Sequence, residues 1–197
     1  SLILVPSASP FHSGKLAVRL GLVSGIGKTS GVPVVYVNQV GGNDSLIFDG
    51  RSFATSGAGR LSFLAAGFAE DLALVDTAAS GPELSLQVDR FEELEQALVL
   101  GIRDYLAKTG FHRVHLGLSG GVDSAVVAVL AVRALGAQSV RFFALPSRYS
   151  SPGSLRDATD LARNLGVPLD TLPIEALFTA SLQTLAPVFA GRPADLT

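Results

Sequence analysis

The segment HLGLSGGVDSAVVAVLAVRAL, residues 115–135, joins an apolar stretch to a helix-like stretch through small residues. Its first part has the character of a buried strand, and residues 123–135 are predicted to form a helix. The turn SGG (119–121) has the composition of a loop that holds a phosphate group. The residues GLSGG (117–121) also fit the G-x-S-x-G pattern of a serine hydrolase, so the segment raises two functional hypotheses.

The order of residues along the chain argues against the hydrolase. A nucleophile elbow of this type needs a histidine base that follows the serine and the acid in the sequence. All three histidines, His12, His112 and His115, precede Ser119, so the triad cannot be assembled in that order from this chain. Two common phosphate-binding loops are excluded by the sequence as well. No lysine follows Gly121, as a Walker loop requires, and the glycine spacing does not match the dinucleotide fingerprint.

The segment SGGVDS (119–124) still suits an anion site. Glycines let several backbone N–H groups converge on an anion, and a helix N-terminus adds positive potential. Ser119 and Ser124 can donate to phosphate oxygens, and Asp123 fits there if Mg²⁺ lies between carboxylate and phosphate. The alternative is a plain strand-to-helix turn with Asp123 as an N-terminal cap. A Walker-like stretch at 21–29 has its first glycine one place too early, and we interpret it as a surface helix end.

The two halves of the chain differ in the order of their predicted strands and helices. Residues 1–80 are predicted to be strands with one helix, and SLIFDGRSFAT (45–55) is predicted to be a hairpin that turns at Asp49-Gly50. Residues 81–90 are polar with Gly and Pro, and form the predicted linker.

Residues 91–197 begin with a predicted helix and continue with strands and helices in alternation. That rhythm indicates a parallel sheet with right-handed crossovers. Ligands of such sheets bind beyond the carboxyl ends of the strands, where residues 119–124 and 146–151 follow two consecutive strands.

Composition limits the classes of protein to which this chain can belong. Of the 197 residues, 48% are apolar and 16% are charged, which indicates a folded protein. The net charge of −2 gives no hint of a nucleic-acid surface, and no apolar run reaches the roughly 18–20 residues of a membrane span. The absence of cysteine excludes disulfides and a thiol nucleophile within this chain. The chain has no methionine and opens on a core-like strand, so we expect a piece of a longer protein.

The motif SGGVDS between a strand and a helix resembles the pyrophosphate loop of the N-type ATP pyrophosphatases, which adenylylate a substrate and release pyrophosphate. Similar loops occur in GMP, asparagine and NAD synthetases and in tRNA-thiolating enzymes. The flanking segments FEELEQALVLGIRDYLAKTGF and LPSRYSSPGSLRDATDLARNLGV resemble the synthetase domain of the glutamine-dependent NAD synthetases. PSASPFHSGK, VPVVYVNQVGGNDSLIFDGRSF and EDLALVD resemble the end of the nitrilase-like glutaminase domain that precedes it in that family.

This resemblance implies an α/β fold in two domains. Residues 1–80 would be the C-terminal part of a nitrilase-like α-β-β-α glutaminase domain, and 81–90 the linker. Residues 91–197 would begin a Rossmann-like ATP pyrophosphatase domain of the adenine nucleotide alpha hydrolase type. The implied enzyme is a cytoplasmic, homo-oligomeric carbon–nitrogen ligase. It would amidate deamido-NAD with ATP, Mg²⁺ and ammonia from glutamine, and release AMP and pyrophosphate.

The resemblance also assigns residues. Ser119 and Asp123 would be catalytic, with Asp123 as the metal ligand, and Ser9 and Lys15 would contact glutamine. The ATP and pyrophosphate site would comprise Gly117, Leu118, Ser119, Gly120, Gly121, Val122, Asp123, Ser124 and Arg148. The family's glutaminase triad of Glu, Lys and Cys is absent from this chain, and its later synthetase residues lie past position 197, so we expect the chain alone to be inactive.

Three other functions compete with this interpretation. A GMP-synthetase-like enzyme would carry a glutaminase of another fold, which VVYVNQVGGNDSLIFDG argues against. A tRNA-thiolating enzyme usually needs cysteines and a basic face, and neither is present. A non-catalytic nucleotide-binding or scaffold module stays open as a third alternative.

Overall fold

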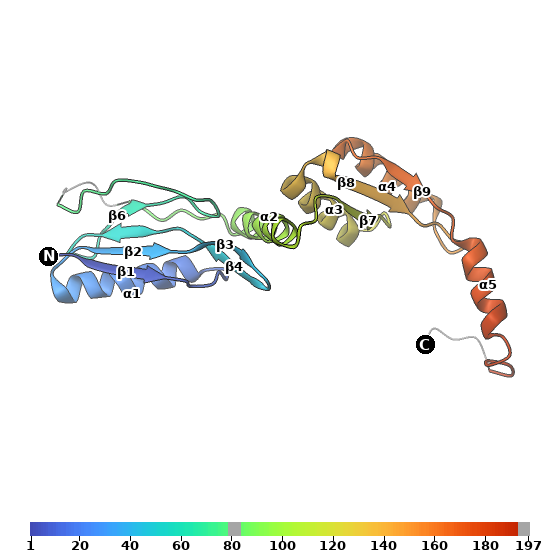
Figure 1. Ribbon diagram of the computed structural model, residues 1–197, viewed down its shortest axis with the longest axis horizontal. Coiled ribbons are helices and arrows are strands. Elements are labelled where there is room, and N and C mark those ends of the chain that lie inside the picture. Colours follow the sequence, from blue (N-terminus) through green and yellow to red (C-terminus); the bar gives the residue numbers. More distant parts are fainter. Residues whose placement is uncertain (79–83, 193–197) are drawn as a thin grey trace. The chain divides into compact units, whose positions relative to one another are not determined.

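The computed structural model describes residues 1–78 and 84–192, which divide into two compact units (Figure 1). The first unit comprises Ser1–His112, and the second begins at Arg113. Each unit is described by itself.

The first unit is built on a four-stranded sheet with the order β1-β2-β5-β6. β1 and β2 are parallel because α1 connects them as a crossover helix, and the other neighbouring pairs are antiparallel. Leu16 and Val23 of α1 pack on Val34, Tyr36 and Phe53 of the sheet. The elements are β1 (Ile3–Ser7), α1 (Lys15–Ser30), β2 (Val34–Asn38), β5 (Phe53–Thr55) and β6 (Leu61–Leu64).

The predicted hairpin over residues 45–55 is wrong in its turn. β4 (Leu46–Asp49) pairs instead with β3 (Val40–Asn43), so the chain reverses at residues 44–45. Gly50 does adopt the expected left-handed backbone, at φ +61°. Gly50 leads the chain from β4 into β5, which belongs to the four-stranded sheet. The stretch contains two turn-like sequences, and pairing with β3 selects the earlier one.

Helix α2 (Arg90–Thr109) confirms the predicted helix and packs on the β3–β4 hairpin. Asp89 caps its start, and Gly110 ends it at φ +78°. Gly42 of the hairpin lies so close to the helix that a Cβ there would be 3.4 Å from the Cα of Gly101. The peptide at Gly42 is held from both sides: its N–H donates to Asp104 Oδ2 at 2.7 Å, and its carbonyl accepts from Lys108 Nζ.

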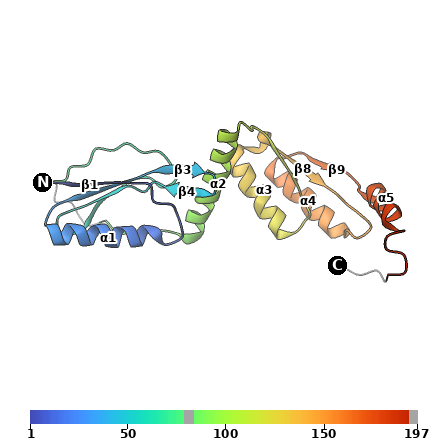
Figure 2. The same ribbon diagram turned by 60° about the horizontal axis from the view of Figure 1, so that its bottom comes forward.

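The second unit confirms the predicted alternation of strands and helices. Its three strands are parallel in the order β7-β8-β9, and α3 and α4 cover one face of the sheet (Figure 2). Phe142 is fully buried between the sheet and both helices, beside Ala128 and Ala158. The elements are β7 (Val114–Gly117), α3 (Val122–Leu135), β8 (Val140–Ala144), α4 (Pro152–Leu165), β9 (Leu169–Thr171) and α5 (Glu175–Leu185), with a 3-10 turn at Ala137–Ser139.

The boundary between the units differs from the predicted linker. α2 belongs to the first unit because its apolar residues Ala97 and Leu100 pack with Phe68 of that unit. Residues 79–83, which include part of the predicted linker, lie outside the described residues. The assignment of residues 1–80 and 91–197 to separate domains stays a prediction. In the described parts of the chain, no helix is both long and apolar enough to cross a membrane.

Candidate active site

The turn between β7 and α3 lies at the carboxyl end of the sheet. Leu118 anchors it: its side chain is buried in the core, and its N–H donates to the carbonyl of Phe143 at 2.8 Å. Gly121 is the N-cap of α3, and no side chain caps the helix. The alternative role of Asp123 as an N-terminal cap is therefore wrong. The carboxylate lies exposed in the first turn of α3, where the positive end of the helix favours an anion.

The hydroxyls of Ser119 and Ser124 organise this turn. They lie 3.0 Å apart, and Ser124 Oγ accepts from the N–H of Ser119 at 3.2 Å. Ser119 Oγ accepts from the N–H of Gly121 at 3.1 Å. The first helical bond runs from Ala125 to the Gly121 carbonyl, so the three N–H groups before Ala125 have no acceptor within the helix. The turn is held in place by its own side chains while those N–H groups point past the helix end.

Gly120 brings a second helix start next to this turn. Its φ is +83°, and a Cβ there would lie 2.2 Å from the carbonyl oxygen of Ser154. Ser154 is in the first turn of α4, which Ser151 caps by accepting from the Ser154 N–H at 3.0 Å. Glycine at 120 is thus required for the close approach of the loop to α4.

A cleft of about 270 Å³ opens between these elements. It lies beyond the carboxyl ends of β7 and β8, the position expected for a ligand of a parallel sheet. With Ser154 in its wall, the cleft is bordered by the start of α4 as well as by the loop that leads into α3. It is lined by Gly117, Leu118, Ser119, Phe143, Ala144, Leu145, Pro146, Ser150, Ser154 and Leu155.

The structure brings most of the predicted nucleotide-binding residues together. Residues 117–119 line the cleft, and residues 120–124 complete the turn that borders it. Arg148 is not in the cleft wall. Its guanidinium instead donates to Glu175 of α5, with Nε to Oε1 at 2.8 Å. Sequence reasoning missed Glu175 because it follows Arg148 by 27 positions and belongs to a helix that was not predicted.

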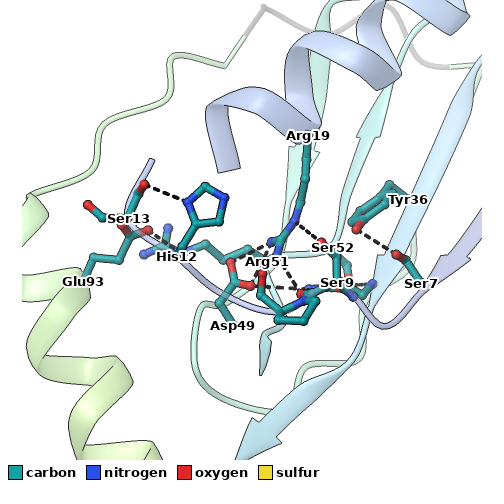
Figure 3. Close-up of polar contacts among 12 residues, drawn as sticks. Ser7, Ser9, His12, Ser13, Arg19, Tyr36, Asp49, Arg51, Ser52 and Glu93 are labelled. Atoms are coloured by element: carbon teal, nitrogen blue, oxygen red, sulfur yellow. Dashed lines mark hydrogen bonds and ion pairs between the residues drawn. The ribbon is translucent and has the colours of Figure 1, made fainter. Parts of the chain in front are cut away.

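Ser9, predicted to contact glutamine, lies in a polar network of the first unit (Figure 3). The centre of this network is the ion pair of Arg19 and Asp49, both almost fully buried, with Nη1 at 2.8 and 2.9 Å from the two carboxylate oxygens. Arg19 Nε donates to Ser9 Oγ at 3.1 Å, and the Ser9 N–H donates to Asn38 Oδ1 at 2.9 Å. Lys15 is half-buried at the first position of α1.

Arg19 and Asp49 were missed at the sequence level. The sequence around Asp49 indicates only a turn before Gly50. A signal was present: Arg19 shares a helical face with Leu16 and Val23, at spacings of three and four, which places a charge on a core-facing stripe. A charge there needs a buried partner.

A second charged contact joins α2 to the β4–β5 connection. Glu93 is buried, and its Oε1 lies 3.9 Å from Nε of Arg51. Burial raises the pKa of Glu93, and the nearby Arg51 opposes that rise without cancelling it. Arg51 also has a positive φ of 48° and lies over the ring of Phe68 at 5.8 Å.

Known proteins share both the sequence and the fold. A model of the NAD synthase family matches residues 94–190. The glutamine-dependent NAD(+) synthetases of Synechocystis sp. and Rhodobacter capsulatus are 47% and 43% identical across the whole chain, which covers 36% and 37% of their lengths. The glutamine-dependent NAD+ synthetase of Acinetobacter baumannii, solved with adenosine diphosphate, is 39% identical and superposes with a TM-score of 0.90 over 99% of this chain and 38% of that one. The chain therefore spans a little over a third of these relatives, and it belongs to the glutamine-dependent NAD synthetase family.

Proposed function

We propose that this chain is part of an enzyme that converts deamido-NAD to NAD, using ATP and ammonia released from glutamine. The observation that carries the proposal is the turn of residues 119–124, which presents the start of α3 at a cleft that the start of α4 also borders. Converging N–H groups and two helix N-termini suit a polyphosphate. The adenosine diphosphate bound to the A. baumannii relative supports a nucleotide as the ligand.

The proposed reaction has two steps. The nicotinate carboxylate of deamido-NAD attacks the α-phosphate of ATP, and pyrophosphate leaves. Ammonia then attacks the adenylate, which gives NAD and AMP. Activation is needed because a carboxylate oxygen is a poor leaving group, whereas AMP is a good one. The turn stabilises the charge that accumulates on the departing pyrophosphate, through the N–H groups of Val122 and Ser124 and the hydroxyl of Ser119.

The residues of the turn fit a magnesium ion shared with the nucleotide. Among the described residues, no three His, Cys, Asp or Glu side chains cluster as a metal site. Asp123 is an exposed carboxylate in the same turn as Ser119 and Ser124, and magnesium is commonly bound by one or two carboxylates together with substrate phosphates. Asp123 would hold the ion at the pyrophosphate, where the metal supplies additional neutralisation of negative charge.

Residues 1–80 are proposed to belong to a nitrilase-like glutaminase, with Ser9 and Lys15 as contacts to glutamine. The chain has no cysteine, so a cysteine nucleophile for glutamine hydrolysis would be supplied from outside these 197 residues. The similarity to glutamine-dependent NAD(+) synthetases supports a role in the use of glutamine. A cytoplasmic location and a homo-oligomeric assembly are part of the same proposal.

The test is deamido-NAD-dependent exchange of pyrophosphate into ATP, measured on the complete protein. Asp123→Asn should lower this exchange and ammonia-driven NAD formation by about 100-fold, because charge on pyrophosphate is left unneutralised. Glutamine hydrolysis should be unchanged. Asp160→Asn is the matched control, since Asp160 lies on α4 and forms an exposed ion pair with Arg163. Ser9→Ala should show the reverse pattern, with a higher glutamine requirement and intact ammonia-driven synthesis. Equal exchange rates in Asp123→Asn and Asp160→Asn would refute the metal role.

A further inference from the structure

The first turn of α5 holds the tip of the loop that follows β8. Glu175, the first residue of α5, accepts from Arg148 at three donors. The backbone N–H of Arg148 lies 3.2 Å from Oε2, and Nε lies 2.8 Å from Oε1, which also accepts from Nη2. Nη2 further donates to the hydroxyl of Thr179 at 3.4 Å, one helical turn along.

Aromatic contacts from α5 hold Arg148 and the next loop residue, Tyr149. The guanidinium of Arg148 lies 5.3 Å from the ring centre of Phe178, and the ring of Tyr149 meets Phe178 edge to face at 5.7 Å. The main chain adds one more bond, from the N–H of Ile174 to the carbonyl of Pro146 at 3.1 Å. α5 and its N-cap residue Ile174 thus contact three of the four residues 146–149 through side chains or backbone.

The loop so held forms one wall of the nucleotide cleft. Leu145, Pro146 and Ser150 line the cleft, whereas Arg148 does not. Three donors of Arg148, including the guanidinium's Nε and Nη2, are engaged on the α5 side. The hydrogen bond from Arg148 lowers the pKa of Glu175, so this carboxylate stays ionised at neutral pH. Arg148 is therefore neutralised locally and fastened away from the cleft wall.

We propose that Glu175 is a positioning residue for the nucleotide cleft, acting through Arg148 to fix the loop of residues 145–150. Arg148 is then a brace between loop and helix rather than a ligand of the phosphates. The inference rests on the proposed function for the identity of the ligand. Both side chains are about half exposed, and exposed ion pairs contribute little to overall stability. The brace should therefore affect nucleotide binding more than folding.

Binding of ATP with MgCl₂ to the complete protein, measured by titration calorimetry, tests the proposal. Glu175→Gln and Arg148→Gln should each weaken ATP binding by about threefold to fivefold, the upper part of the range expected for one exposed ion pair. The double variant should be no weaker than either single one, because both changes release the same loop. The thermal unfolding midpoint should stay within error of wild type. Asp160→Asn, which breaks an exposed ion pair of α4, should bind ATP as wild type does.

Two outcomes would overturn the brace. If Arg148→Gln weakens binding while Glu175→Gln leaves it unchanged or tighter, Arg148 contacts the phosphates itself. If the double variant shows the product of the two single effects, the residues act independently. Arg148→Lys adds a second check, since a lysine keeps the charge but cannot reproduce the Nε and Nη2 bonds and should bind ATP as weakly as Arg148→Gln. Pyrophosphate exchange with deamido-NAD on the wild type tests the proposed function separately, because ATP affinity is measured without that substrate.

Discussion

Gly120→Ala should destabilise the second unit through one specific clash. Gly120 has a φ of +83°, and an added Cβ would lie 2.2 Å from the carbonyl oxygen, 2.7 Å from the Cα and 2.8 Å from the carbonyl carbon of Ser154. These are backbone atoms at the start of α4, so relief requires the helix to move away from the loop. A side chain with a free end could rotate aside, but a helix start cannot.

The expected loss has two parts. A Cβ in the left-handed region costs about 1–2 kcal/mol. Forcing an extra methyl into a packed contact costs about 1–3 kcal/mol more. Gly166→Ala is the matched control, because Gly166 has a φ of +67° in the same unit and nothing within 4 Å of an added Cβ. The free energy of unfolding should therefore fall by about 2–5 kcal/mol for Gly120→Ala and by only about 1–2 kcal/mol for Gly166→Ala.

Hydrogen exchange of amides in α3 and α4 measures this loss, because it reports on the second unit without assuming that the whole chain unfolds in one transition. ATP binding to the complete protein is the second readout, since displacement of α4 would widen the cleft in Gly120→Ala alone. Equal losses of protection in the two variants would show that the close contact between Gly120 and Ser154 does not affect the free energy of unfolding. The reasoning about the loop would then be refuted.

Two further predictions concern the first unit. Asp49→Asn leaves the buried guanidinium of Arg19 without a counter-charge, so the free energy of unfolding should fall by about 3–5 kcal/mol. Urea denaturation followed by hydrogen exchange of the β1 and β2 amides measures this loss. A loss below about 1 kcal/mol would contradict the importance of the ion pair. Burial raises the pKa of Glu93 above 4.5, so the folded state binds this proton more tightly, and stability should fall as pH rises from 4.5 through the raised pKa. Glu93→Gln should flatten that part of the profile of thermal midpoint against pH, whereas an unchanged slope would assign it to other groups.

The second unit was largely predictable because its signals are local. Alternating strands and helices, with Gly166 at the end of one helix, indicate the parallel sheet without further information. The turn of residues 117–124 could be found for the same reason, since its glycines and hydroxyls lie within eight positions. The order of strands places that turn at the cleft.

The features that could not be predicted depend on distant partners. Whether the chain reverses before or after β4 is decided by pairing with β3 and by packing on α2, more than 40 residues away. The ion pair of Arg148 with Glu175 could not be predicted either, because Glu175 lies in a later helix. Asp49 shows the same limit: a residue typical of turns became one half of a buried ion pair once α1 placed Arg19 above it.

The fastening of α2 to the β3–β4 hairpin has a practical consequence for dissecting the protein. A gene fragment that begins at residue 91 would encode a helix whose buried face, at Ala97 and Leu100, has lost the hairpin that covers it. Such a fragment would expose an apolar stripe and tend to aggregate. Proteases should likewise cleave residues 90–109 slowly while two side chains of the helix hold the peptide of Gly42. The natural place to cut is the short connection at residues 110–113.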